Sequence, residues 1–194
     1  MGKIDTRDAL VGAVASGTPV KYLHFWGHRP RADGQVGPSC LSQWWPSPFV
    51  VEGVAYATAE HWMMASKARL FGDAEAERQA IEAPNPALAK KAGRLVRDFD
   101  NAVWERERFG IVVGGSVHKF AAHPGLRAFL LGTGGRVLVE ASPMDRVWGI
   151  GLAANDDGAH DPRRWRGENL LGFALMEARE RLRLGDGSAE GIQG

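Results

Sequence analysis

The sequence predicts an α+β fold, a predominantly helical single domain with a few short strands. Most segments between Gly and Pro residues have the apolar spacing of amphipathic helices, whereas β-favouring runs are short and scattered. The chain has 194 residues, of which 44% are hydrophobic and 24% charged, enough for one buried core. We therefore assign one domain to residues 1–184 and a disordered C-terminal tail to residues 185–194.

The first part of the chain contains one short helix, two strand regions and a long helix. An amphipathic pattern predicts the short helix over 5–16, and the aromatic run KYLHFW predicts a strand over 21–26. A Gly- and Pro-rich loop over 27–39 precedes two strand fragments within 49–56, which turn at Glu52-Gly53. Thr58 is expected to cap a helix that ends near Phe71, before Gly72.

Helices dominate the remainder of the chain. Their predicted ranges are 73–83, 86–96, 101–122 with an interruption at Gly114-Gly115, 124–132 and 169–185. The run RVLVEAS over 136–142 predicts a strand, and the Gly-, Asp- and Pro-rich stretch 153–168 predicts a loop.

Composition limits the classes of partner. Twenty-four Lys and Arg against 23 Asp and Glu leave a net charge of +1, which lacks the basic surplus of a general nucleic-acid binder. The single Cys40 excludes an internal disulfide framework and suits a reducing compartment. The charged start of the chain has no signal-peptide core, and its apolar runs are too short to span a bilayer. We expect a soluble, cytoplasmic protein without membrane contact.

Cofactor and metal motifs are not supported. The stretch GIGLAA over 149–154 fits a loose dinucleotide fingerprint, but the residues after it do not open a helix that would hold a pyrophosphate. His118 and His123 are five positions apart, about 140° around a helix, and His61 has no His four positions later. We expect neither a metal site nor a cofactor.

Two clusters of residues are candidates for chemistry. Glu60 and Lys67 fall on one face of the helix over 58–71, although a capping glutamate and a lysine reaching towards solvent would explain both. Asp145 and Trp148 follow the strand over 136–142, where loops commonly carry functional groups. Asn169 precedes the last helix, so an N-cap explains it as well as a functional role does.

Several blocks of the sequence, in order, resemble the NADAR (NAD- and ADP-ribose-associated) or YbiA-like family. They run from about Tyr22 to Leu184 and include CLSQWWPSPFVVEGVAYATAEHWMMASKARLF, KKAGRLVRDFDNAVW, LLGTGGRVLVEASPMDRVWGIGL and WRGENLLGFALMEARERL. The resemblance implies a YbiA-like fold. It also implies an N-glycosidase that hydrolyses the bond between ribose and a base or amine.

The resemblance also implies the functional residues. The glutamate and lysine of the family match Glu60 and Lys67, and its D-x-x-WG-x-G and N-x-LG blocks match Asp145, Trp148 and Asn169. Gly149 and Gly151 are expected to let the backbone approach a ligand. Where many members have EHYFQ, this chain has EHWMM, so Met64 stands in place of a glutamine and the resemblance leaves the leaving-group specificity open.

Known family activities imply two classes of substrate. One is a ribosylamino-pyrimidine phosphate of riboflavin biosynthesis, and the other is ADP-ribosylated guanine, which would involve limited contact with nucleic acid. The near-neutral charge favours the smaller substrate. A catalytically silent ADP-ribose or nucleotide-binding module is the alternative function, and the oligomeric state is left open. Lys67 has two roles open to it, a phosphate anchor or a Schiff-base nucleophile.

Overall fold

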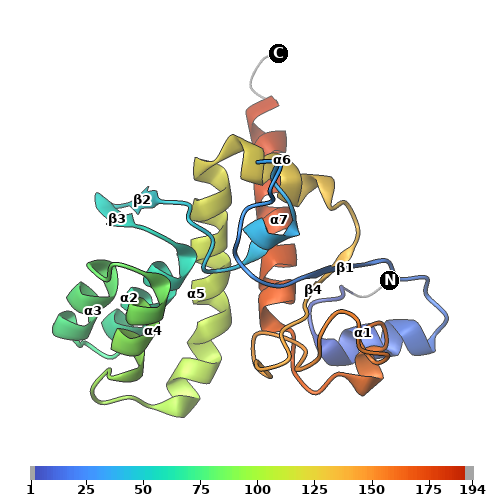
Figure 1. Ribbon diagram of the computed structural model, residues 1–194, viewed down its shortest axis with the longest axis horizontal. Coiled ribbons are helices and arrows are strands. Elements are labelled where there is room, and N and C mark those ends of the chain that lie inside the picture. The colour runs from blue at the N-terminus through green and yellow to red at the C-terminus, as the bar shows by residue number, and fades with distance from the viewer. Residues whose placement is uncertain (1–2, 191–194) are drawn as a thin grey trace. The chain divides into compact units, whose positions relative to one another are not determined.

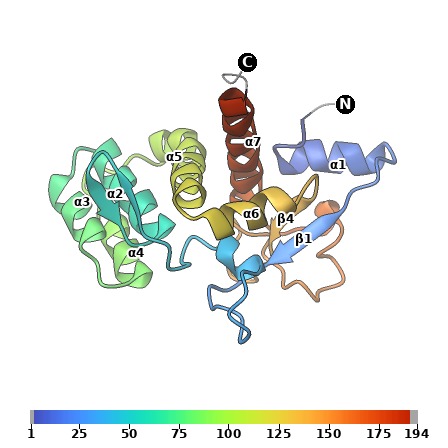
Figure 2. The ribbon, with the colours of Figure 1, turned by 90° about the horizontal axis from the view of Figure 1, so that it is seen from above.

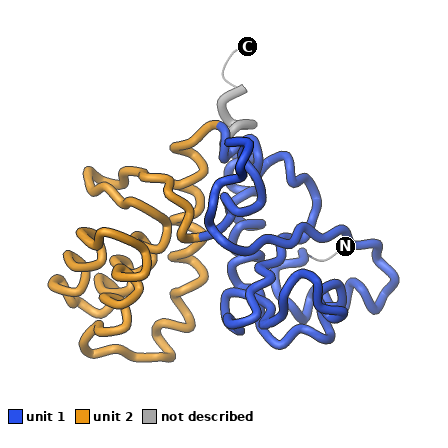
Figure 3. The backbone as a smooth tube through the Cα atoms, viewed as in Figure 1, with its two compact units in different colours: residues 1–42, 125–194 blue, residues 43–124 orange. Residues whose placement is uncertain are grey.

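The computed structural model describes residues 3–190 and confirms a predominantly helical α+β fold (Figure 1). The chain divides into two compact units, which are described separately. Unit 1 comprises residues 1–42 and 125–194, and unit 2 comprises residues 43–124 (Figure 3).

Unit 1 is built around a pair of parallel strands, β1 (Tyr22–Phe25) and β4 (Val137–Glu140). Tyr22 pairs with Val137 and Phe25 with Glu140, so both strands end at the same edge (Figure 2). The first three residues of β4 are buried, as expected for a parallel strand covered by other elements. Helix α7 (Leu170–Glu190) packs against β4.

The other elements of unit 1 are short. Helix α1 (Arg7–Ala15) begins at Thr6, whose hydroxyl accepts a hydrogen bond from the Ala9 N–H at 3.1 Å. It packs against the 3₁₀ turn η2 (Pro162–Arg164), whereas η1 (Pro38–Leu41) lies beside β1. Helix α6 (Pro124–Gly132) leads into β4.

Unit 2 combines a hairpin with four helices. Strands β2 (Phe49–Val51) and β3 (Val54–Tyr56) pair antiparallel across a turn in which Glu52 and Gly53 have φ values of 50° and 82°. Two consecutive positive φ values are characteristic of the tight turn that suits strand twist. The helices are α2 (Ala59–Leu70), α3 (Ala74–Ile81), α4 (Pro86–Arg94) and α5 (Asn101–Ala122), and α2 packs against the other three.

The predicted interruption of α5 at Gly114-Gly115 is wrong, because the helix is continuous from Asn101 to Ala122. A Cβ on Gly115 would lie 2.3 Å from Cδ1 of Trp62, so this glycine makes room for the indole ring. The Trp62 indole N–H donates to the Ile111 carbonyl at 2.9 Å, one turn earlier on α5. Gly115 therefore serves helix packing and not helix termination.

Two boundaries at the C-terminal side of the chain also differ from expectation. The strand predicted over 136–142 ends at Glu140, and the last helix continues to Glu190, past the predicted end at residue 185. The disordered tail over 185–194 stays a prediction, and its last four residues lie outside the described part of the chain. Between residues 3 and 190, no helix combines the length and the apolar character that crossing a bilayer requires.

Candidate active site

Glu60 lies in the first turn of α2, where it is 2% exposed. Its backbone N–H donates to the Gln43 carbonyl at 3.0 Å, which attaches the start of the helix to the segment before the hairpin. The positive end of the helix dipole favours a negative charge at this position. The structure therefore holds a carboxylate in a buried setting that the helix itself helps to stabilise.

Thr58 occupies the N-cap position of α2, but its side chain does not cap the helix. Its hydroxyl lies 2.8 Å from Nδ1 of His61, and Nε2 of His61 lies 3.0 Å from the Ala83 carbonyl. Because a carbonyl only accepts, Nε2 carries the proton and Nδ1 accepts from Thr58. Burial lowers the pKa of His61, which keeps the ring neutral. His61 thus joins the start of α2 to the segment between α3 and α4.

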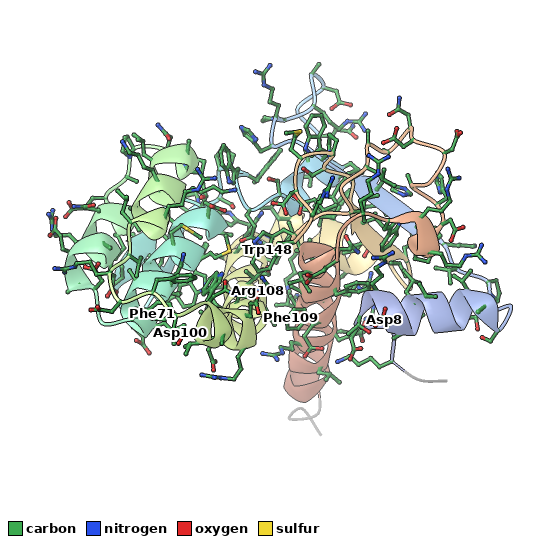
Figure 4. The ribbon with its side chains drawn as sticks, turned by 90° about the horizontal axis from the view of Figure 1, so that it is seen from below. Asp8, Phe71, Asp100, Arg108, Phe109 and Trp148 are labelled. Carbon is green, nitrogen blue, oxygen red and sulfur yellow. The ribbon has the colours of Figure 1, made fainter. Side chains whose placement is uncertain are left out.

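Lys67 lies two turns after Glu60 and is partly buried beneath aromatic rings. Its ammonium is 4.1 Å from the centre of the Phe99 ring and 5.4 Å from that of Trp104. Phe71 contacts Phe99 edge-on, with ring centres 5.2 Å apart. Figure 4 labels Phe71 and, near it, Asp100. Burial lowers the pKa of Lys67, because the rings replace part of the water that stabilises the ammonium.

The helical spacing over 101–122 predicts a core position for Trp104, but the residue is only partly buried, so this prediction is wrong. The apolar spacing of α5 predicts which face is inward, but Trp104 is in the first turn, where the helix covers Lys67. Met64, in contrast, is 6% exposed and packs against α4, since a Cβ on Gly93 would lie 2.1 Å from its sulfur. Met64 therefore contributes to the packing of α2 against α4.

In unit 1, Asp145 organises the loop that follows β4. Its Oδ1 accepts hydrogen bonds from the N–H groups of Val147 at 2.9 Å and Trp148 at 2.8 Å. Its backbone carbonyl accepts from the Gly151 N–H at 3.0 Å. The carboxylate is partly exposed, so it fixes the turn and still has access to solvent.

Trp148 is partly buried and lies in this loop beside α7 (Figure 4). Its carbonyl accepts a hydrogen bond from the Leu171 N–H at 3.1 Å, in the first turn of α7. The backbone of Trp148 is thus held at both ends, by Asp145 and by α7. An aromatic ring on such a fixed loop is suited to stacking on a flat heterocycle.

Asn169 joins α7 to β4 through its side chain. It is fully buried and has a φ of 58°, a conformation that asparagine tolerates better than most residues. Its Oδ1 accepts from the Glu140 N–H and its Nδ2 donates to the Leu138 carbonyl, both at 2.9 Å. Asn169 precedes α7 as the N-cap interpretation expects, but its amide binds the edge of β4. Its contact with substrate stays a prediction.

The two glycines of this loop are required by close packing. A Cβ on Gly149 would lie 2.9 Å from the Glu140 carbonyl oxygen and 3.1 Å from that of Asp145. Gly151 has a φ of 66°, and a Cβ there would meet Arg166 at 3.0 Å and Arg146 at 3.2 Å. Both glycines therefore have structural roles, and the expected approach of a ligand to their backbone stays a prediction.

The structure thus places the predicted residues in two groups. Glu60 and Lys67 are on one helix of unit 2, and Asp145, Trp148 and Asn169 belong to one hydrogen-bonded network in unit 1. Within residues 3–190, no group of three His, Cys, Asp or Glu side chains is arranged to hold a metal ion.

Sequence reasoning missed Gln43. It is 8% exposed, and its buried Oε1 has no hydrogen-bond partner within residues 3–190. Its backbone carbonyl binds the N–H of Glu60. The signal available in the sequence was a polar amide between the apolar residues Leu41 and Trp45.

Comparison with known proteins identifies the class of protein. The NADAR domain family matches residues 24–183, which span both units, and the chain belongs to this family. The resemblance inferred from the sequence blocks is confirmed.

Individual relatives agree with this assignment. N-glycosidase R617 of Acanthamoeba polyphaga mimivirus is 40% identical over 165 residues, 82% of this chain and 95% of the relative. N-glycosidase YbiA of Escherichia coli K12 is 33% identical over 135 residues, 70% of this chain and 76% of the relative. The NMR structure of E. coli YbiA superposes with a TM-score of 0.64 and 26% identity, covering 86% of this chain and 87% of that one. The YbiA-like fold is therefore confirmed.

Proposed function

We propose that this protein is an N-glycosidase, a hydrolase that cleaves the C–N bond between ribose and a base or amine. The observation that carries the proposal is the buried carboxylate of Glu60 in a chain whose relatives are named N-glycosidases. The matching lysine and aspartate, Lys67 and Asp145, support a catalytic protein over the alternative, a silent ADP-ribose or nucleotide-binding module, since binding alone does not need all three groups.

The chemistry assigns different tasks to the two carboxylates. Cleavage at the anomeric carbon develops positive charge on the ribose ring, and a carboxylate below that carbon stabilises it. The leaving amine or base must gain a proton, and the attacking water must lose one. We assign charge stabilisation to Glu60, because a buried carboxylate acts strongly on a nearby cation. Asp145 then serves proton transfer, and Trp148 stacks on the heterocycle.

The proposal includes two classes of substrate. Ribosylamino-pyrimidine phosphates of riboflavin biosynthesis are small, and the net charge of +1 favours them over a long nucleic acid. ADP-ribosylated guanine is the second class, because an extruded or terminal base requires few phosphate contacts. A product assay that offers both substrates to the purified protein distinguishes the two. Hydrolysis of neither, together with binding of ADP-ribose, would favour the silent binder.

Glu60→Gln tests the proposal. The substitution keeps the shape of the side chain and removes its charge, so it should abolish hydrolysis while the melting temperature stays close to that of the wild type. Glu75→Gln is the matched control, because Glu75 is exposed on α3 and pairs with Arg78. Full activity in Glu60→Gln would refute the assigned role, as would a loss of activity explained by unfolding.

A substitution and a chemical trapping experiment distinguish the two roles proposed for Lys67. A phosphate anchor needs only charge, so Lys67→Arg should retain most activity. A Schiff-base nucleophile needs a neutral amine, and the lowered pKa of Lys67 supports this second role. When the ribose ring opens, C1 carries an iminium to the leaving group. The neutral amine of Lys67 adds to C1, and the leaving amine or base departs with the proton that the lysine nitrogen gives up, so a Schiff base to Lys67 remains. Water then hydrolyses this Schiff base to release the sugar aldehyde and the free lysine. Borohydride should reduce the Schiff base and leave a sugar adduct visible by mass spectrometry. An active Lys67→Arg enzyme without an adduct would exclude the covalent role.

A further inference from the structure

The side chains of two arginines begin beside the Asp145–Trp148 turn of unit 1. A Cβ placed on Gly151 would lie 3.0 Å from Cβ of Arg166 and 3.2 Å from Cγ of Arg146, so the two side chains leave the backbone from one small region. Both arginines are exposed. Hence two arginine side chains start next to each other, beside the loop that carries Trp148.

The backbone around these arginines is fixed by hydrogen bonds. The Arg166 N–H donates to the Ile150 carbonyl at 2.9 Å, and the Arg146 carbonyl accepts from the Glu168 N–H at 3.0 Å. These bonds join the stretches 145–151 and 166–169, which are far apart in the sequence. The positions from which both side chains extend are therefore set by the fold.

Neither guanidinium has a protein partner within residues 3–190, since no hydrogen bond or ion pair joins them to another side chain or carbonyl. Arg163, three residues before Arg166, instead pairs with Asp161 at 2.8 Å. A doubly charged anion that both side chains reach is attracted by two positive charges. The planar donors of arginine match the oxygens of phosphate in number and direction.

We propose that Arg146 and Arg166 together bind a phosphate group of the substrate, next to the heterocycle that Trp148 contacts. The inference rests on the proposed function and adds a binding site to it. Ribosylamine phosphates carry a phosphomonoester and ADP-ribosylated guanine carries a diphosphate, so this chemistry fits both substrate classes. With the phosphate held here, Lys67 is not required as an anchor.

The experiment measures binding, so it does not depend on turnover. Isothermal titration compares ribose 5-phosphate, ADP-ribose and unphosphorylated ribose at one fixed ionic strength. The proteins are the wild type, Arg146→Ala, Arg166→Ala, the double variant and Arg163→Ala. Arg163→Ala is the matched control, because it removes an exposed arginine of the same loop that already has a carboxylate partner.

We expect the wild type to bind at least one of the two phosphorylated ligands about 100-fold more tightly than ribose, and each single variant to lose roughly 10-fold of that preference. The double variant should bind ribose and the phosphorylated ligands alike, whereas Arg163→Ala should behave as the wild type. Loss for ribose 5-phosphate alone identifies a monoester site, and loss for ADP-ribose alone identifies a diphosphate site.

Two results would overturn the inference. One is a wild type that binds neither phosphorylated ligand more tightly than ribose. The other is a folded double variant that keeps the wild-type preference, where folding is checked by thermal melting. If the preference depends on the two arginines but the wild type hydrolyses neither substrate class, the phosphate site stands and the N-glycosidase proposal fails.

Discussion

Asn169→Ala should destabilise the protein strongly, because the side chain of Asn169 connects α7 to β4. The substitution removes two hydrogen bonds of 2.9 Å and leaves the Glu140 N–H and the Leu138 carbonyl without those partners. It also places alanine at a φ of 58°. At roughly 1–2 kcal/mol for each unsatisfied group and about 1 kcal/mol for the left-handed conformation, we expect a loss of about 3–5 kcal/mol.

Urea unfolding followed by circular dichroism measures this loss. Asn169→Gly is the matched comparison, because glycine loses the same hydrogen bonds but adopts a positive φ without strain. It should therefore be about 1 kcal/mol more stable than Asn169→Ala, apart from the cost of glycine's greater freedom in the unfolded chain. A change below about 0.5 kcal/mol in Asn169→Ala would show that the amide does not hold β4 to α7.

Three further predictions follow from individual contacts. Trp104→Ala should lower the free energy of unfolding by about 1–2 kcal/mol, measured by thermal or urea unfolding, which is less than the roughly 3–5 kcal/mol expected for a fully buried aromatic residue. A larger loss would show that Trp104 contributes to stability as a core residue does. Asp73 is held by the guanidinium of Arg97, which lowers the pKa of its carboxyl, so Asp73→Asn should be destabilising at pH 7. The ion pair contributes fully above the unfolded pKa near 3.9, and this contribution is lost as the pH falls through the lowered pKa of the folded carboxyl. The deficit should therefore shrink as the pH falls below about 4, and a deficit constant between pH 7 and pH 2 would contradict the ion pair. Gln43→Leu should be neutral or up to about 1 kcal/mol stabilising, since the amide oxygen it removes has no partner, and a loss above about 2 kcal/mol would show that the amide supports the fold.

Local patterns in the sequence predicted most of the secondary structure. The hairpin was predictable from Glu52-Gly53 between two β-favouring runs, because its turn depends on adjacent residues. The continuity of α5 was not predictable, because Gly115 makes room for the indole ring of Trp62 on α2, which is distant in the sequence. A glycine that serves packing and one that ends a helix look the same in a single sequence.

In the candidate site, too, the sequence predicts some features and only the structure shows the others. The family blocks supplied Glu60, Lys67, Asp145 and Trp148, and the structure added the surroundings that give these groups their properties. The rings over Lys67 come from the segment after α4 and from the start of α5, which no helical periodicity of α2 reveals. Gln43 likewise becomes a candidate only when its unpartnered oxygen is seen.

The surroundings of Lys67 and of the two arginines bear on the same mechanistic choice. A phosphate anchor must stay charged and accessible, which describes the exposed guanidinium groups of Arg146 and Arg166. Lys67 lies instead under Phe99 and Trp104, and burial lowers the pKa of its amine. Aromatic faces attract an ammonium, but they do not replace all of its hydrogen bonds to water, so a neutral amine is easier to form there. Because the two kinds of cation have opposite surroundings, we assign phosphate binding to the arginines and covalent chemistry to Lys67. This assignment predicts that Lys67→Arg is inactive, whereas Arg146→Ala raises only KM.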